Sequence, residues 1–158
     1  MSALPGTTGR RRIYLMRHGF VDYTSKEVRD TRDPSVAHLT EQGEAEARSA
    51  GVALSEVEFD LAICSGLRRT RQTAEIVLAE HPNAPPLEED ARFGELRSGQ
   101  YIDFKSPEHL AATMTFTFEN AGKPDATFLP GGEKFADAMV RIEKGLRALL
   151  YRPSWACA

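Results

Sequence analysis

Short apolar runs alternate with longer amphipathic stretches along this chain. The runs at residues 13–16, 59–64 and 87–93 have the length of buried β-strands. Between them, apolar residues recur at helical spacing, most clearly over residues 67–80. This strand–helix–strand–helix–strand order, followed by further helices, predicts an α/β sandwich with a largely parallel sheet.

Capping residues predict where the other helices begin. Thr40 and Glu41 suit the first turn of a helix, as a side-chain acceptor and as a negative charge at the positive end of the dipole. Ser106 followed by Pro107 is a second start signal. A last amphipathic helix is predicted from about residue 133 to 151.

Two segments are harder to assign from the pattern. Residues 19–38 are polar and interrupted by Pro34, and we predict a long loop there, of a length that is usually functional or mobile. Residues 113–118 alternate polar and apolar side chains, so helix and strand compete.

Composition limits the functional classes. The 158 residues suffice for one domain with a real core, and the net charge of −3 gives no basic field for nucleic acid. Two cysteines make no disulfide framework and suit a reducing compartment. No apolar run is long enough for a membrane span, and no signal peptide follows the N-terminal arginines. We therefore predict a disordered leader at 1–9 and one cytoplasmic domain over 10–158, with no membrane partner.

Candidate chemistry lies where the predicted strands end, which is where open α/β folds bind ligands. Arg17, His18 and Gly19 follow the first strand. An isolated Arg-His-Gly is more often a solvated strand end, because short motifs match by chance. The second strand, however, leads into Ser65 and Arg69 at a helix N-terminus, where backbone N–H groups and a guanidinium favour an anion.

Together these residues favour phosphoryl transfer. A neutral His18 could attack phosphorus if one ring nitrogen donated to a backbone carbonyl and left the other free. The leaving group then needs a proton, for which Glu95, in the loop after the third strand, is the best candidate.

Five motifs in this order resemble those of the histidine phosphatase superfamily, which includes the cofactor-dependent phosphoglycerate mutases. They span residues 13 to about 142. The motifs are Leu15-Met16-Arg17-His18-Gly19, Leu39-Thr40-x-x-Gly43, Ser65-x-Leu67-x-Arg69-x-x-Gln72-Thr73-Ala74, Glu95-x-x-x-Gly99 and Pro130-Gly131-Gly132-Glu133.

The resemblance implies a fold and a set of roles. The fold would be a three-layer α/β/α sandwich like that of phosphoglycerate mutase. His18 would be the phosphorylated nucleophile and Glu95 the acid and base, while Arg17, Arg69, Gly19 and Ser65 would bind the phosphoryl group. No metal or organic cofactor is implied. The substrate would be a phosphorylated small molecule or phosphoprotein.

The chain departs from the family pattern in three places. Phe20-Val21-Asp22 follow Gly19, where many members have a polar residue and then Ser or Thr, and Lys134 stands where Ser is usual. The second catalytic His, expected after a last strand that would begin near Trp155, is absent. The remaining histidines match no family motif: His38, His81 and His109.

From this absence we predict a C-terminally incomplete domain, with weak or no turnover and a tendency to aggregate or form a homodimer through an open sheet edge.

We predict a phosphomonoester hydrolase that acts through a phosphohistidine on His18, and three other functions compete with this prediction. A cysteine phosphatase needs Arg six positions after its Cys, but Thr70 stands there after Cys64, and Arg69 comes one residue too early. A mutase would need a long ordered lid to exclude water, and residues 101–129 are only moderately long. A non-catalytic module that binds phosphate or phosphoprotein on the same fold stays open.

Overall fold

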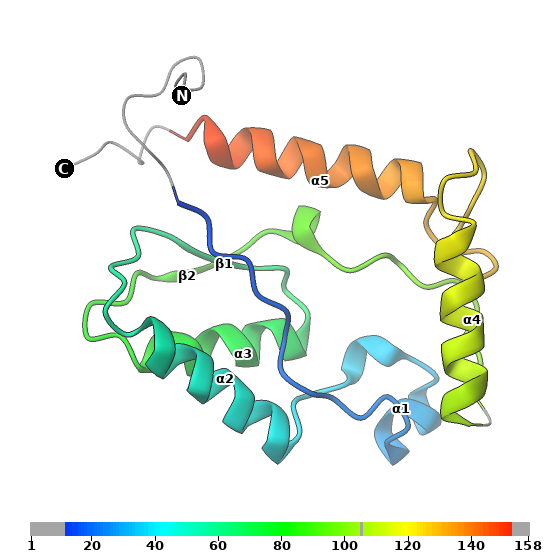
Figure 1. Cartoon of the computed structure of the whole chain (residues 1–158), viewed down its shortest axis with the longest axis horizontal. Coiled ribbons are helices and arrows are strands. Elements are labelled where there is room, and N and C mark those ends of the chain that lie inside the picture. The colour runs from blue at the N-terminus through cyan, green and yellow to red at the C-terminus, as the bar shows by residue number, and fades with distance from the viewer. Residues whose placement is uncertain (1–11, 105, 153–158) are drawn as a thin grey trace.

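The structure is a computed structural model that describes residues 12–104 and 106–152. Helices dominate it, and Figure 1 shows their arrangement. The elements are α1 (Lys26–Thr31), the 3₁₀ turn η1 (Pro34–Val36), α2 (Glu41–Leu54), β1 (Ala62–Cys64), α3 (Arg68–Ala79), β2 (Leu87–Glu89), the 3₁₀ turn η2 (Ala91–Phe93), α4 (Pro107–Glu119) and α5 (Phe135–Leu150). The leader predicted at residues 1–9 and the apolar run from Trp155 lie outside the described residues.

The sheet within the described residues consists of two parallel strands. β1 pairs with β2 in a register that places Ala62 opposite Leu87 and Cys64 opposite Glu89. Figure 1 shows α2 and α3 on one side of these strands and α5 on the other. The helices and strands therefore form the three layers of an α/β/α sandwich. Parallel strands leave their carboxyl ends at one edge of the sheet, which is where the sequence places Ser65 and the residues after β2.

Local sequence signals correctly predicted the helix starts. Thr40 caps α2 by accepting from the N–H of Gly43 at 3.2 Å, and Ser106 caps α4 by accepting from the N–H of His109 at 3.2 Å. The ambiguous segment 113–118 is helical and belongs to α4. Cys64 is buried at the end of β1, as expected of a structural strand residue rather than a nucleophile.

All three strand predictions were wrong in extent or kind, and the run 59–64 is a strand only over Ala62–Cys64. Residues 13–16 form no strand, and Leu15 exposes 88% of its surface. A strand exists only through its hydrogen-bonded neighbours, and no described segment pairs with these residues. The predicted strand 87–93 ends at Glu89, because Asp90 accepts from the N–H of Arg92 at 2.9 Å and starts the η2 turn.

The predicted loop 19–38 contains α1 and η1 and carries its own small core. Ser25 caps α1, and Arg32 ends it in the left-handed conformation with φ of 54°. Val28 and Ala37 are buried against Val21 and Leu39, which form an antiparallel bridge. The segment thus folds back on itself and holds the chain after His18 in a defined path.

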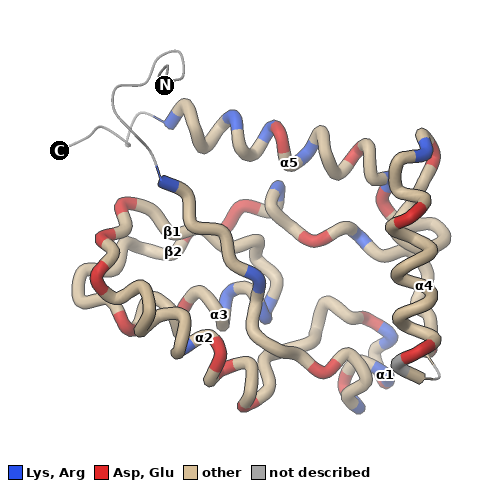
Figure 2. Tube along the Cα trace, in the orientation of Figure 1, with Lys and Arg blue, Asp and Glu red and all other residues tan. Residues whose placement is uncertain are grey.

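Charge is distributed evenly. Figure 2 shows Lys and Arg positions interspersed with Asp and Glu positions along the described chain. None of the helices within residues 12–104 and 106–152 is long and apolar enough to cross a bilayer.

Candidate active site

His18 is held with one ring nitrogen occupied and the other turned toward Tyr23. Its Nδ1 lies 2.8 Å from the carbonyl oxygen of Gly19, which can only accept, so Nδ1 carries the proton. Nε2 then bears the lone pair, and it lies 3.4 Å from the Tyr23 hydroxyl. One ring nitrogen donates to a backbone carbonyl and the other keeps its lone pair, as a nucleophilic imidazole needs.

Electrostatics favour the neutral form of this ring. Burial lowers the pKa of His18 below its usual 6.5, and the hydrogen bond to the Gly19 carbonyl partly opposes that shift. The positive charges of Arg69 and Arg17 lower the pKa of His18 further, while Glu95 raises it. A lowered pKa leaves the imidazole unprotonated at neutral pH, which a nucleophile needs.

Gly19 places the His18 backbone against two helices. A Cβ at Gly19 would lie 2.2 Å from the carbonyl oxygen of Gly43 in α2, so only glycine permits the approach. The N–H of Gly19 donates to Oγ1 of Thr73 in α3 at 3.1 Å, and that hydroxyl donates to the carbonyl of Arg69 at 2.8 Å. Left-handed φ values among the described glycines occur at Gly66 and Gly131 and not at Gly19, so backbone conformation is not the reason for this glycine. The residue is needed for close packing instead.

Arg69 is the buried cation of the site. Only 4% of its surface is exposed, and its guanidinium lies 5.5 Å from the centre of the Tyr23 ring. Nη1 donates to the carbonyl of Pro34 at 3.2 Å, but the buried Nε has no partner among the described residues. A buried unsatisfied donor on a cation costs about 1–3 kcal/mol or more, and a negative charge beside the guanidinium would offset part of the cost of burying that cation.

The other arginines of α3 point away from His18. Arg68 is exposed and pairs with Glu27, and Arg71 is exposed and pairs with Glu89. Of these three arginines, Arg69 is therefore the one on the buried face of α3, and its phosphate-binding role stays a prediction. Arg17 is itself exposed, yet near enough to lower the pKa of His18.

Glu95 comes from the loop between η2 and α4. Its charge affects the pKa of both His18 and Tyr23, which places the carboxylate near them. The side chain is exposed, and its own contact is with the N–H of Leu96 at 3.3 Å. The first, third and fourth sequence motifs therefore contribute side chains to one region of the fold.

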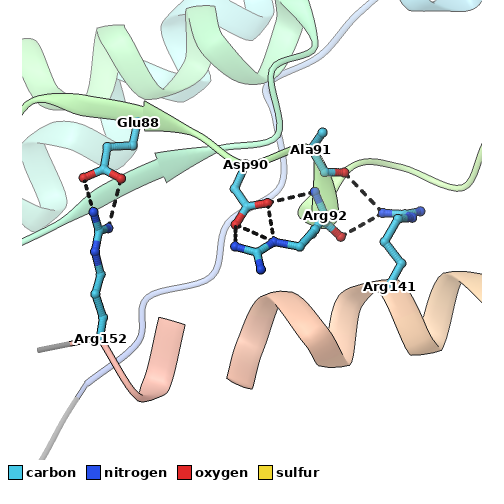
Figure 3. A network of polar contacts seen from close by, with 6 residues as sticks. All are labelled: Glu88, Asp90, Ala91, Arg92, Arg141 and Arg152. Carbon is cyan, nitrogen blue, oxygen red and sulfur yellow. Dashed lines mark hydrogen bonds and ion pairs between the residues drawn. The ribbon is translucent and has the colours of Figure 1, made fainter. Parts of the chain in front are cut away.

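The backbone of this loop is anchored on α5. Figure 3 shows Arg141 of α5 reaching the carbonyls of Ala91 and Arg92, with distances of 3.5 and 2.8 Å. Arg92 in turn forms a two-pronged pair with Asp90. Lys134, which replaces the usual Ser of the family, pairs with Asp125 at 2.7 Å.

Two further residues near the site are Ser65, which the sequence singled out, and Tyr23, which it did not. The Ser65 hydroxyl contacts Oγ1 of Thr70 at 3.0 Å, and no hydrogen bond within the described residues joins it to His18, so its phosphate-binding role stays a prediction. Tyr23 was missed. It touches both His18 and Arg69, and burial raises the pKa of its hydroxyl. A tyrosine five residues after His18 gave no signal in the sequence.

The remaining described histidines make other contacts. His38 lies 3.2 Å from Glu27, His81 packs on Phe59, and His109 packs on Phe104. Within residues 12–104 and 106–152, no three His, Cys, Asp or Glu side chains form a group that could hold a metal ion.

Sequence comparison identifies relatives of this chain. The family model of the histidine phosphatase superfamily (branch 1) matches residues 13–156. A 2,3-bisphosphoglycerate-dependent phosphoglycerate mutase of Methylobacterium sp. (strain 4-46) is 37% identical over 140 residues, which is 84% of this chain and 64% of the relative. The mutase of the same name from Beijerinckia indica is 30% identical with the same coverage. The chain thus spans less than two thirds of the length of these relatives.

Solved structures show the same fold. A mycobacterial glucosyl-3-phosphoglycerate phosphatase, solved with inorganic phosphate, superposes with a TM-score of 0.63 at 20% identity over 89% of this chain and 64% of that chain. The YhfR protein of Bacillus stearothermophilus has a TM-score of 0.61 at 23% identity over 87% of this chain and 66% of that chain. Together, the family model, the relatives and the shared fold show that this chain belongs to the histidine phosphatase superfamily, branch 1.

Proposed function

We propose that this protein hydrolyses phosphomonoesters through a phosphohistidine formed on His18. The observation that carries the proposal is the state of His18 itself. Its Nδ1 is occupied by the Gly19 carbonyl at 2.8 Å, which leaves the lone pair on Nε2, and the buried Arg69 has a donor without a partner. A nucleophile next to an unsatisfied cation suits an incoming phosphate group.

The reaction would proceed in two displacements. In the first, Nε2 of His18 attacks phosphorus, the P–O bond to the alcohol breaks, and the departing oxygen takes a proton from the carboxylic acid of Glu95. In the second, the Glu95 carboxylate takes a proton from water, and the resulting hydroxide displaces phosphate from Nε2. Arg69 and Arg17 would offset the negative charge that spreads over the phosphoryl oxygens in both steps.

Before the first step the Tyr23 hydroxyl has to leave Nε2. Its 3.4 Å contact is longer than a normal O–H···N hydrogen bond, so little energy is lost when substrate displaces it. Tyr23 can then donate to the phosphoryl group, since it stays against Arg69.

A labelling experiment tests this proposal. The protein is incubated with a radiolabelled phosphomonoester, and we expect an adduct that is labile in acid and absent from His18→Ala. His38→Ala is the matched control, because His38 lies in the same segment and pairs with Glu27. Phosphate binding without an adduct or turnover would refute the proposal and favour the non-catalytic binding module.

A mutase-type transfer is the second candidate, and it is favoured by the names of the two mutase relatives. The two activities differ in the acceptor of the second step, which is water for a hydrolase and a second phosphorylated alcohol for a mutase. Incubation with a phosphoglycerate distinguishes them: a hydrolase releases inorganic phosphate, and a mutase converts one phosphoglycerate isomer into another with no net release.

A further inference from the structure

An ion pair between Glu133 and Arg141 contacts the backbone of the loop that carries Glu95. Nε and Nη2 of Arg141 donate to the two carboxylate oxygens of Glu133 at 2.9 and 2.7 Å. The two side chains expose only 14% and 9% of their surface. The Glu133–Arg141 pair is therefore more buried, and geometrically more restricted, than an ordinary surface ion pair.

Both members of this pair also bind the backbone around Glu95. Nη1 of Arg141 donates to the carbonyl of Arg92 at 2.8 Å and of Gly94 at 3.1 Å. Glu133 accepts from the N–H of Arg97 at 3.2 Å, and its own N–H donates to the Arg97 carbonyl at 2.9 Å. The contacts therefore bracket Glu95 on both sides, at positions 94 and 97.

The end of the same loop is packed tightly against the Gly131–Gly132 turn. A Cβ on Gly99 would lie 1.9 Å from the carbonyl oxygen of Pro130, and one on Gly132 would lie 2.0 Å from that of Phe128. The N–H of Gln100 donates to the Pro130 carbonyl at 2.9 Å. Residues 94–99 contain no helix or strand, so these contacts and the Glu133–Arg141 pair determine where the loop lies.

The carboxylate of Glu95, by contrast, is exposed and has no salt bridge among the described residues. Its own hydrogen bond is from the adjacent N–H of Leu96 at 3.3 Å, so the location of the carboxylate depends on the backbone of the loop. A proton donor has to lie within hydrogen-bond reach of the leaving oxygen, and small displacements of such a group reduce the rate strongly.

We propose that the Glu133–Arg141 pair is a positioning device that aims Glu95 at the leaving-group oxygen. The inference rests on the proposed phosphomonoester hydrolysis and extends it to two residues that do not touch the substrate. Neither residue is catalytic. They act by holding positions 92–97 of the backbone in place.

The test uses the leaving group as a readout. Loss of proton donation slows the hydrolysis of alkyl phosphates, whose alkoxides are poor leaving groups, far more than that of p-nitrophenyl phosphate. In the double variant Glu133→Gln/Arg141→Met, which leaves no unpaired buried charge, we expect kcat/KM for an alkyl phosphate to fall about tenfold or more, because kcat/KM reports the first displacement, in which Glu95 donates its proton. For p-nitrophenyl phosphate we expect a fall of less than about threefold. Arg141→Lys keeps the charge but loses the paired donors of the guanidinium. We expect it, too, to lose more activity on the alkyl phosphate than on p-nitrophenyl phosphate.

The matched control lies on the same helix. Glu143 and Arg147 form an exposed ion pair on α5 at 2.7 Å, so Glu143→Gln/Arg147→Met removes the same chemical groups without touching the Glu95 loop. This control should keep the activity on both esters. Combining the Glu133–Arg141 variant with Glu95→Gln should add little to the loss caused by Glu95→Gln alone, because the pair acts through Glu95.

Several outcomes would overturn the inference. One is full alkyl phosphatase activity in Arg141→Lys or in the double variant. Equal losses on both esters, or losses that multiply with Glu95→Gln, would show a merely structural role. Amide hydrogen exchange provides a readout without turnover: the amides of residues 94–97 should exchange faster in the double variant than in wild type, and equal rates would refute the positioning. If wild type hydrolyses neither ester and forms no adduct, the proposed function fails, whatever the exchange shows.

Discussion

Thr73 connects the His18 backbone to α3, and its replacement by valine tests how the nucleophile is held in place. Thr73 is 4% exposed, and its hydroxyl accepts from the buried N–H of Gly19 at 3.1 Å. Valine keeps the shape of threonine but removes the acceptor. The Gly19 N–H, which is buried, then loses this partner.

The expected magnitude follows from this lost acceptor. An unsatisfied buried donor costs about 1–3 kcal/mol, and the free energy of unfolding should fall by that amount in Thr73→Val. The His18 ring depends on the Gly19 carbonyl for its orientation, so turnover should fall as well. Thr73→Ser keeps the hydroxyl and loses one methyl group, worth about 1 kcal/mol of burial, so it should keep most of its activity.

Urea denaturation and p-nitrophenyl phosphate turnover measure the two effects. Thr117→Val is the control, because Thr117 is also buried in a helix, yet its hydroxyl only donates to the carbonyl of Thr113 within its own helix at 2.8 Å. We expect this control to stay close to wild type. Equal stability losses in Thr73→Val and Thr117→Val, or equal activity losses in Thr73→Val and Thr73→Ser, would refute the reasoning.

Three further predictions concern the charged groups of the site. Arg69→Ala should reduce turnover far more than Arg68→Ala, since only Arg69 is buried beside the nucleophile; steady-state kinetics with equal losses would contradict this. Glu95→Gln should slow alkyl phosphates more than aryl phosphates, and equal slowing would argue against proton donation. Because burial lowers the pKa of His18, adduct formation should decline with falling pH at a midpoint below 6.5, and a midpoint above 6.5 would be inconsistent with the structure. Because the pKa of His18 is lower in the folded state, the unfolded state binds a proton on this imidazole more readily. The contribution of His18 to the free energy of unfolding should therefore decrease as pH falls from 6.5 through the folded-state pKa.

The sequence alone determined the features that depend on local interactions. The starts of α2 and α4 were predictable because their capping side chains, Thr40 and Ser106, lie within three residues of the N–H groups that they accept from. The inward position of Arg69 followed from its place in a motif and from helical periodicity. Both kinds of signal are carried by neighbours along the chain, so no knowledge of the tertiary structure was needed.

Tertiary structure decided what depends on distant partners. Residues 13–16 have the composition of a strand, but a strand also needs a hydrogen-bonded neighbour, which no described segment provides. The need for glycine at position 19 arises from the approach of Gly43, and the contact of Tyr23 with His18 arises from the way residues 19–38 fold back. The Glu133–Arg141 pair reaches the loop of Glu95 from about 40 residues further along the chain. Such contacts have no fixed spacing in the sequence, because packing between separate elements brings the residues together, and only the folded chain reveals them.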